Sequence, residues 1–255
     1  MLGVQFTTPA GYREVFAREV WALYETEFPQ IQEQSALEPR FEVFGGQSSD
    51  PSVQVRFGVV KGPIRNRYWF LTRDEGELIQ FQHDRFIHNW RKKGDKDEYP
   101  RFEPIVAKYG GELDSLERYF HSKNWGSLAP NQCELTYVNH IPLLDAQGSA
   151  LPRSFYFRKL DVSLIGDSSE FSASLRQIML DGENNPIGRL YVDAVTRSDA
   201  NGKPIIALNL TARGAPAAPN CAAAVAFLQE ARLRIVRTFA AITSDAAHVK
   251  WGRTQ

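Results

Sequence analysis

Alternation of apolar and polar residues is clearest in the second half of the chain. Four segments there alternate so that every second position is mostly apolar, which predicts half-buried β-strands. These segments are residues 155–165, 171–180, 187–197 and 204–213. The links between them contain the turn residues Gly166-Asp167, Asp181-Gly182 and Asn201-Gly202. We therefore expect an antiparallel meander, which a strand at 133–141 extends to four or five strands.

The first half carries shorter segments of the same alternating kind. They fall at residues 4–6, 41–44, 53–60, 68–72, 78–82 and 86–90. Asp74-Glu75-Gly76 predicts a hairpin turn between two of these strands. The pattern breaks at His83-Asp84-Arg85, where we expect a bulge or a turn.

Helical spacing of apolar residues occurs in three places. Residues 12–27, 102–121 and 220–242 each repeat apolar positions at intervals of three and four. Asn220 is a favourable N-cap for the last of these helices. The charged stretch 91–99 is expected to be an exposed loop.

The order of these elements predicts the fold class. Strands come in serial groups that a helix follows, and they do not alternate with helices as in βαβ units. We therefore expect an α+β fold of two similar halves, each an antiparallel sheet covered on one face by a long helix. The halves would be residues 1–125 and residues 126–255, the second holding the meander and the C-terminal helix.

Composition and charge exclude several classes of protein. The 255 residues carry 30 basic and 30 acidic side chains, and 12 % of the residues are aromatic. The aromatic content argues against a disordered chain, and the charge balance argues against a nucleic-acid-binding protein. The first residues lack the features of a secretory signal, and two cysteines are too few for a disulfide framework. We expect a cytoplasmic protein that does not bind membranes.

Sequence signatures of catalysis are missing. The histidines have no zinc-ligand spacing, and neither a nucleophile elbow nor a phosphate-binding loop occurs. Cys133 is expected to be a buried apolar residue. Cys221 lies at a helix N-terminus, which can lower the pKa of a thiol, but we expect it to be inert because no histidine or other base is near it in the sequence. We therefore expect no catalytic residue, metal site or cofactor. Asp84 and Glu98, with Lys96, form a weak nuclease-like set.

Two polar segments are the candidate binding sites. The first combines amides, charges and an aromatic ring on one strand and its exit loop, which suits recognition of a peptide or a nucleic-acid backbone, or else a solvated sheet face. It comprises Gln80, Gln82, Asp84, Arg85, Asn89, Trp90 and Arg91, followed by Lys92 and Lys93. The second comprises Tyr137, Asn139 and His140, where Asn139 either ties its strand to a neighbouring segment or lines a cavity with Tyr137.

The same segments resemble a sporadically distributed bacterial protein family of unknown function. The resemblance rests on LIQFQHDRFIHNWR at 78–91, YPRFE at 99–103 and ELTYVNHI at 134–141. The family's hallmark strand, Y-x-N-x-I, corresponds to Tyr137, Asn139 and Ile141. The resemblance implies no catalytic residue, and the scattered occurrence of the family implies a mobile anti-phage or toxin–antitoxin locus.

These observations favour a non-enzymatic binding or adaptor protein whose partner is another protein or a second copy of the chain. One alternative is a small-ligand or nucleotide sensor with a pocket between sheet and helix, using Tyr137, Asn139, Arg85 or Asn89. A second alternative is a metal-dependent nuclease that uses Asp84 and Glu98.

Overall fold

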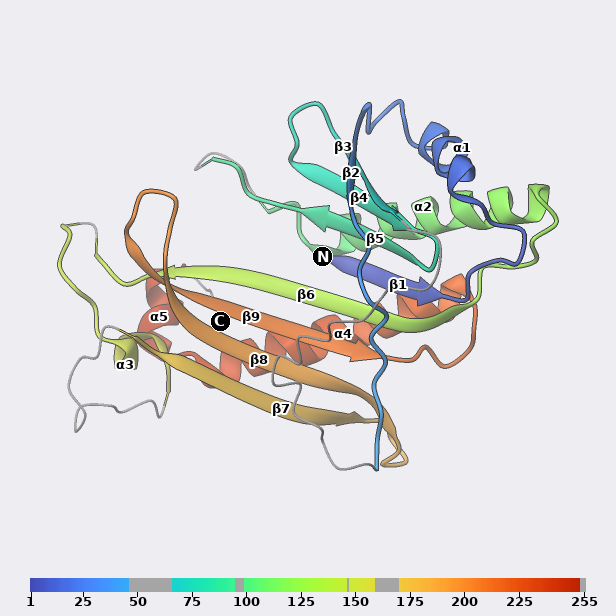
Figure 1. Ribbon diagram of the computed structural model, residues 1–255. Coiled ribbons are helices and arrows are strands. Elements are labelled where there is room, and N and C mark those ends of the chain that lie inside the picture. Colours follow the sequence, from blue (N-terminus) through green and yellow to red (C-terminus); the bar gives the residue numbers. More distant parts are fainter. Residues whose placement is uncertain (46–65, 95–98, 146, 159–169, 253–255) are drawn as a thin grey trace, which may run out of the picture. The chain divides into compact units, whose positions relative to one another are not determined.

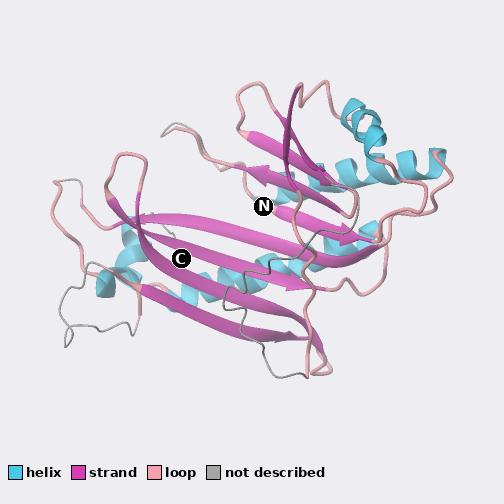
Figure 2. Cartoon of the chain, viewed as in Figure 1, coloured by secondary structure: helices cyan, strands magenta, loops and turns pink. Residues whose placement is uncertain are grey.

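The computed structural model describes residues 1–45, 66–94, 99–145, 147–158 and 170–252. Within these residues the fold is mixed α/β, with a large antiparallel sheet of nine strands and five α-helices (Figures 1 and 2). The hydrogen-bonded strand order is β2-β3-β4-β5-β1-β6-β9-β8-β7. The described part has no helix that is both long and apolar enough to cross a membrane.

The chain divides into two compact units. Unit 1 comprises Met1–Glu134 and Gly214–Leu228, and unit 2 comprises Leu135–Arg213 and Gln229–Gln255. Unit 1 therefore includes residues 126–134 and 214–228, which belong to the second half predicted from the sequence.

Unit 1 contains a β-sheet and a long helix. Its elements are β1 (Leu2–Phe6), a 3₁₀ turn (Glu14–Phe16), α1 (Ala17–Ala22), β2 (Gln30–Ser35), β3 (Asn66–Leu71), β4 (Glu77–Gln82), β5 (Arg85–Trp90), α2 (Phe102–Ser122), the start of β6 (Pro130–Pro142) and the start of α4 (Cys221–Ile242). Helix α2 packs against β5, where the Tyr109 hydroxyl donates to the main-chain oxygen of Phe86 at 2.9 Å. This contact fixes one face of the sheet as the side of the apolar core.

The strand register of unit 1 separates two faces of its sheet. Ile79 pairs with His88 and Phe81 pairs with Phe86, and all four side chains are buried. Because successive side chains point to opposite faces of a strand, the residues between them lie on the other face. That face carries Gln80 and other polar side chains.

Unit 2 contains the predicted meander. Its elements are the rest of β6, α3 (Arg153–Tyr156), β7 (Ser172–Leu180), β8 (Pro186–Ser198), β9 (Pro204–Gly214), the rest of α4 and α5 (Asp245–Lys250). The pairs Val192↔Leu210 and Ala194↔Leu208 put buried apolar residues on one face of the sheet. The prediction of antiparallel strands at 171–180, 187–197 and 204–213 is confirmed to within two residues at each end.

Several predicted elements differ from the observed ones. The predicted strand at 41–44 is wrong, since no strand occurs there, and the strand Gln30–Ser35 was not predicted. The helix expected at 12–27 is a 3₁₀ turn and the short α1. The break at His83-Asp84 is a tight turn between two antiparallel strands. The predicted strand 53–60 lies outside the described residues, as does most of 155–165, whose first two residues end α3.

Candidate functional site

One face of the unit 1 sheet is lined by side-chain amides and arginines. We call it the glutamine face. It carries Gln5 on β1, Arg67 and Trp69 on β3, Gln80 and Gln82 on β4, Arg85 and Asn89 on β5, and Gln132 on β6. The register assigns most of these residues to one face, since Trp69 pairs with Gln80 and Gln82 pairs with Arg85. Four of these eight side chains are buried and the other four are half-buried, with Gln82 only 1 % exposed.

A hydrogen-bonded chain holds the centre of the glutamine face. The Gln80 side-chain oxygen accepts from Arg67 Nη1 at 2.6 Å and from Trp69 Nε1 at 3.2 Å. The Gln80 side-chain nitrogen donates to Asn89 Oδ1 at 2.8 Å. A buried amide that uses both its oxygen and its nitrogen in this way has a fixed orientation. The face is therefore a preorganised set of donors and acceptors.

The chain itself lies across this face. We call residues 37–42, which follow β2, the strap (Figure 1). Gln82 binds the main chain of Leu37 at both atoms, accepting from its N–H at 2.8 Å and donating to its carbonyl at 3.0 Å. Gln5 binds Arg40 in the same two-fold manner, at 3.0 Å and 2.6 Å.

A third glutamine holds the far end of the strap. Gln132 accepts from the main-chain N–H of Glu42 at 3.2 Å. Three strands, β4, β1 and β6, thus each contribute one glutamine to the same extended segment. These bonds are to the main chain of the strap, whereas side chains such as Phe41 (55 % exposed) are not packed into the core.

The paired contacts of Gln82 and Gln5 imitate a β-ladder. In an antiparallel pair, two residues exchange two N–H···O bonds. Here the side-chain amide of a glutamine takes the place of the main chain of one of these two residues. The clamped residues Leu37 and Arg40 are three apart, which equals one turn of a polyproline II helix, and Pro39 lies between them. Gln82 and Gln5 therefore hold the strap through main-chain atoms of Leu37 and Arg40, which every residue except proline offers in full.

The predicted binding residues of the first segment do not form one site in the structure. Arg85 and Asn89 lie on the glutamine face, and Arg85 is buried. Trp90 lies on the opposite face and contacts the ring of Tyr99 at 5.3 Å. Arg91 follows the strand and pairs with Glu75 at 2.9 Å, so it is part of the hairpin turn.

The predicted residues of the second segment belong to unit 2. Tyr137 is half-buried and His140 is exposed. Asn139 Nδ2 donates to the main-chain oxygen of Leu208 on β9 at 3.3 Å. Asn139 thus ties its strand to another strand of unit 2.

A charged cluster around the buried pair His88 and Glu112 lies on the core face of unit 1, and sequence reasoning did not single it out. His88 Nδ1 is 2.9 Å from Glu112 of α2, and its Nε2 is 3.4 Å from Glu77 of β4. Lys108 pairs with both Glu77 and Glu27. Burial opposes the charged form of His88, but the hydrogen bonds to Glu112 and Glu77 outweigh it and raise the pKa of the imidazole. Since His88 is 1 % exposed, the cluster is suited to joining β4 and β5 to α2.

The two cysteines do not form a nucleophilic site. Burial raises the pKa of both Cys133 and Cys221 to about 12, so the helix N-terminus does not lower the pKa of Cys221, and the raised value agrees with the inert thiol that the sequence favours. Within the described residues no group of three or more His, Cys, Asp or Glu side chains is arranged to hold a metal ion. The nuclease-like pair cannot be placed as a set, because Glu98 lies outside the described residues. Asp84 accepts from Gln82 and Arg85.

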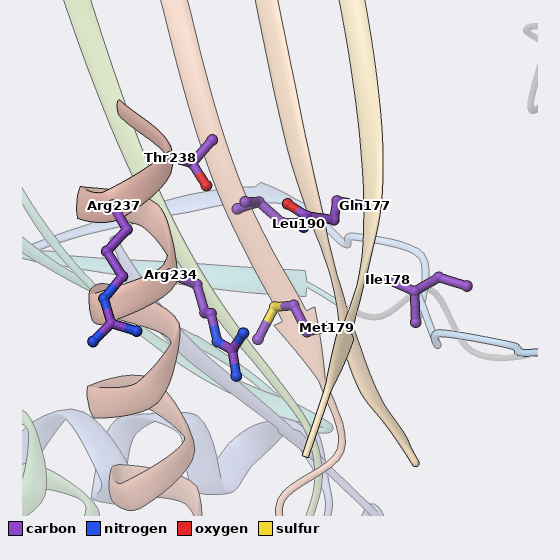
Figure 3. Close-up of a pocket in the computed structure, with 7 residues that line it drawn as sticks. All are labelled: Gln177, Ile178, Met179, Leu190, Arg234, Arg237 and Thr238. Carbon is purple, nitrogen blue, oxygen red and sulfur yellow. The ribbon is translucent and has the colours of Figure 1, made fainter. Parts of the chain in front are cut away.

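Unit 2 has a hollow of about 160 Å³ between β7 and α4 (Figure 3). Met179, Leu190, Arg234 and Thr238 are among its lining residues. Arg234 is already engaged there, by Glu230 at 2.6 Å and by the main-chain oxygen of Leu180 at 3.1 Å. The hollow is smaller than the roughly 300–1,000 Å³ of typical small-molecule pockets. None of the four residues proposed for a sensor pocket lines it.

Comparison of the chain with protein-family models, with curated proteins and with solved structures finds no match.

Proposed function

We propose that this protein is a non-enzymatic, cytoplasmic binding or adaptor protein whose glutamine face takes an extended segment of a protein partner. The observation that carries the proposal is the pair of two-fold amide clamps, Gln82 on Leu37 and Gln5 on Arg40. A face that already holds one extended main chain has the donors and acceptors to hold another. The strap then occupies the site within the free protein.

The exposure of the strap supports exchange with a partner. Its side chains contribute little buried apolar area, since Glu38, Pro39, Arg40 and Phe41 are all exposed. The free energy that holds it comes mainly from main-chain hydrogen bonds, each contributing on the order of 1 kcal/mol. A segment held in this way can be displaced by a partner that adds side-chain contacts.

A synthetic peptide tests the proposal. In the full-length chain, Leu37, Arg40 and Glu42 are replaced by proline, which removes the main-chain N–H groups that the three glutamines bind, and the fold of this strap-replaced protein is checked by circular dichroism. A fluorescent peptide of residues 35–45, SALEPRFEVFG, is then titrated and its anisotropy is recorded. We expect saturable binding, weakened about ten-fold or more by Gln82→Ala, because two main-chain bonds are lost.

The control is Gln177→Ala, which removes an exposed glutamine of unit 2. It should leave the affinity unchanged. A folded strap-replaced protein that fails to bind the peptide at millimolar concentration would overturn the proposal. Equal affinities for Gln82→Ala and Gln177→Ala would also contradict it.

We also propose two finer points that rest on the sequence. The chain belongs to the sporadically distributed bacterial family that it resembles, as an accessory component of a mobile anti-phage or toxin–antitoxin locus. Residues 1–125 and 126–255 are similar halves, each a sheet covered on one face by a long helix. The long helices α2 and α4, each following a run of strands, support this second point.

A further inference from the structure

Arg85 lies beneath the strap, between the two clamps. It pairs in register with Gln82 on one side and with Gln5 on the other. Since the strap is held over β4 at Leu37 and over β1 at Arg40, its residues 38–39 cross β5, the strand of Arg85. The Arg85 guanidinium is therefore beside the path of any main chain that occupies the face.

Arg85 has a buried donor without an acceptor. Its side chain is 6 % exposed. Its Nε donates to Asp84 at 3.2 Å, but its Nη2 has no hydrogen-bond partner in the described part of the chain. An unpaired buried donor of a charged group is costly, so this position calls for an acceptor.

The neighbouring Arg67 adds to the excess of donors. Its Nη1 binds Gln80, while its Nε is buried and has no hydrogen-bond partner among the described residues. Burial, followed by the positive charge of Arg85, lowers the pKa of Arg67. The Asp84 carboxylate pairs with Arg85, so the second guanidinium group, that of Arg67, leaves a positive charge on this face that favours a further anionic occupant.

The strap does not supply that anion. Its one carboxylate between the clamps belongs to Glu38, whose side chain is exposed. The strap thus satisfies the amide clamps and leaves the Arg85 donor open. The strap is a partial occupant of a site that recognises something more.

We propose that Arg85, supported by Arg67, binds an acidic side chain of the partner segment at the position where it crosses β5. This inference rests on the proposed function and adds the class of partner, an extended acidic peptide. A carboxylate accepts two parallel hydrogen bonds from a guanidinium, which gives a directional, charge-assisted contact. The glutamines would hold the main chain, and the arginines would select the side chain.

Matched peptides test the inference. The strap-replaced protein is titrated with the parent peptide SALEPRFEVFG and with its Glu38→Gln, Pro39→Glu and Pro39→Gln versions. We expect the Pro39→Glu peptide to bind about ten-fold or more tightly than the Pro39→Gln peptide. The Glu38→Gln peptide should bind like the parent peptide, because Glu38 is exposed in the strap. Arg85→Gln should abolish the preference for Glu over Gln at position 39. Arg85→Lys should retain part of it, because lysine keeps the positive charge but cannot donate two parallel hydrogen bonds to a carboxylate.

Arg91→Gln is the control variant, since Arg91 is exposed and pairs with Glu75 of the hairpin turn. It should leave the Glu-over-Gln ratio unchanged. If Arg85→Gln does not fold, salt provides a second measurement. The preference of the unsubstituted face should shrink between about 50 mM and about 500 mM salt, as for an ion pair that is partly reached by solvent.

The outcomes separate the two proposals. If all peptides bind and Glu and Gln versions bind equally, the peptide site stands and the acidic specificity is wrong. If no peptide binds, the proposed function itself fails. If inorganic phosphate competes while no peptide shows a Glu preference, the arginines form a small-anion site, and the inference is again wrong.

Discussion

The imidazole of His88 lies between β5 and α2, with its Nδ1 atom 2.9 Å from the carboxylate of Glu112. Both side chains are buried, at 1 % and 7 % exposure. The Tyr24 hydroxyl adds a bond to the main-chain oxygen of Glu112 at 2.8 Å. A charged pair in this position attaches α2 to the sheet that carries the glutamine face on its other side. The stability of unit 1 should therefore depend on it.

Glu112→Gln should lower the free energy of unfolding by about 2 kcal/mol, because a charge-assisted bond becomes a neutral one. Urea unfolding followed by circular dichroism measures the change. Asp114→Asn is the matched control, since Asp114 is exposed on the same helix, and it should change stability by less than about 0.5 kcal/mol. Equal effects of the two substitutions would contradict a stabilising role for the pair.

The cluster of His88, Glu112 and Glu77 should stabilise unit 1 most between about pH 4.5 and 6.5. The pKa of His88 is raised above its ordinary 6.5, so its contribution is complete below pH 6.5 and is lost as pH rises through the raised pKa. Hydrogen bonding to His88 is the largest cause that lowers the pKa of Glu77 from 4.5 to about 2. The contribution of Glu77 is therefore present above pH 4.5 and is lost as pH falls toward 2. In His88→Gln both slopes of stability against pH should flatten, and unchanged slopes would refute this assignment.

Both thiols should be unreactive in the folded protein. Cys133 is fully buried and Cys221 is 6 % exposed, and their pKa values of about 12 leave little thiolate at neutral pH. A thiol-disulfide reagent should modify them at least about a hundred-fold more slowly than it modifies the urea-unfolded chain. Rapid modification under native conditions would show that one of these sites opens.

Asn220→Ala should cost about 1 kcal/mol of stability. The Asn220 side chain accepts from the main-chain N–H of Ala223 at 2.8 Å and so caps α4. Asn220→Asp keeps the acceptor and should remain close to the unsubstituted protein in a thermal melt. If Asp and Ala destabilise alike, the cap contributes nothing.

Gln5→Ala should expose the strap to trypsin at Arg40. The clamp holds both main-chain groups of Arg40, whereas its side chain is exposed. Cleavage needs a locally released main chain, so loss of the clamp should speed it. Mass spectrometry of the fragment that ends at Arg40 follows the rate, with Gln177→Ala as the control. Identical rates would show that the clamp does not restrain the strap.

The meander of unit 2 could be predicted from the sequence because burial on one face leaves a period of two. Its pairs, such as Val192↔Leu210, repeat that period over several residues, and turn residues mark the ends. The strand Gln30–Ser35 could not be predicted in this way. Its apolar residue Ile31 is 46 % exposed, and it lies at the end of the strand order with few buried contacts.

The site could be predicted in part. Alternation along β4 and β5 brought Gln80, Gln82, Arg85 and Asn89 into one candidate segment, and they share one face. The partners Gln5 and Gln132 come from strands far away in the sequence, so no local pattern could join them to that segment. Residues 41–44 have the alternation of a strand, but the main chain of Glu42 pairs with a side-chain amide. A pattern of side chains does not reveal that kind of pairing.

Because the clamps contact only main-chain atoms of the strap, substitutions within it leave those contacts in place. The strap can therefore change its sequence without a matching change in the sheet, as long as it stays extended. Residues 38–41 are for the same reason a graft position, at which a short foreign epitope would be displayed in an extended, exposed form on a scaffold that needs no redesign.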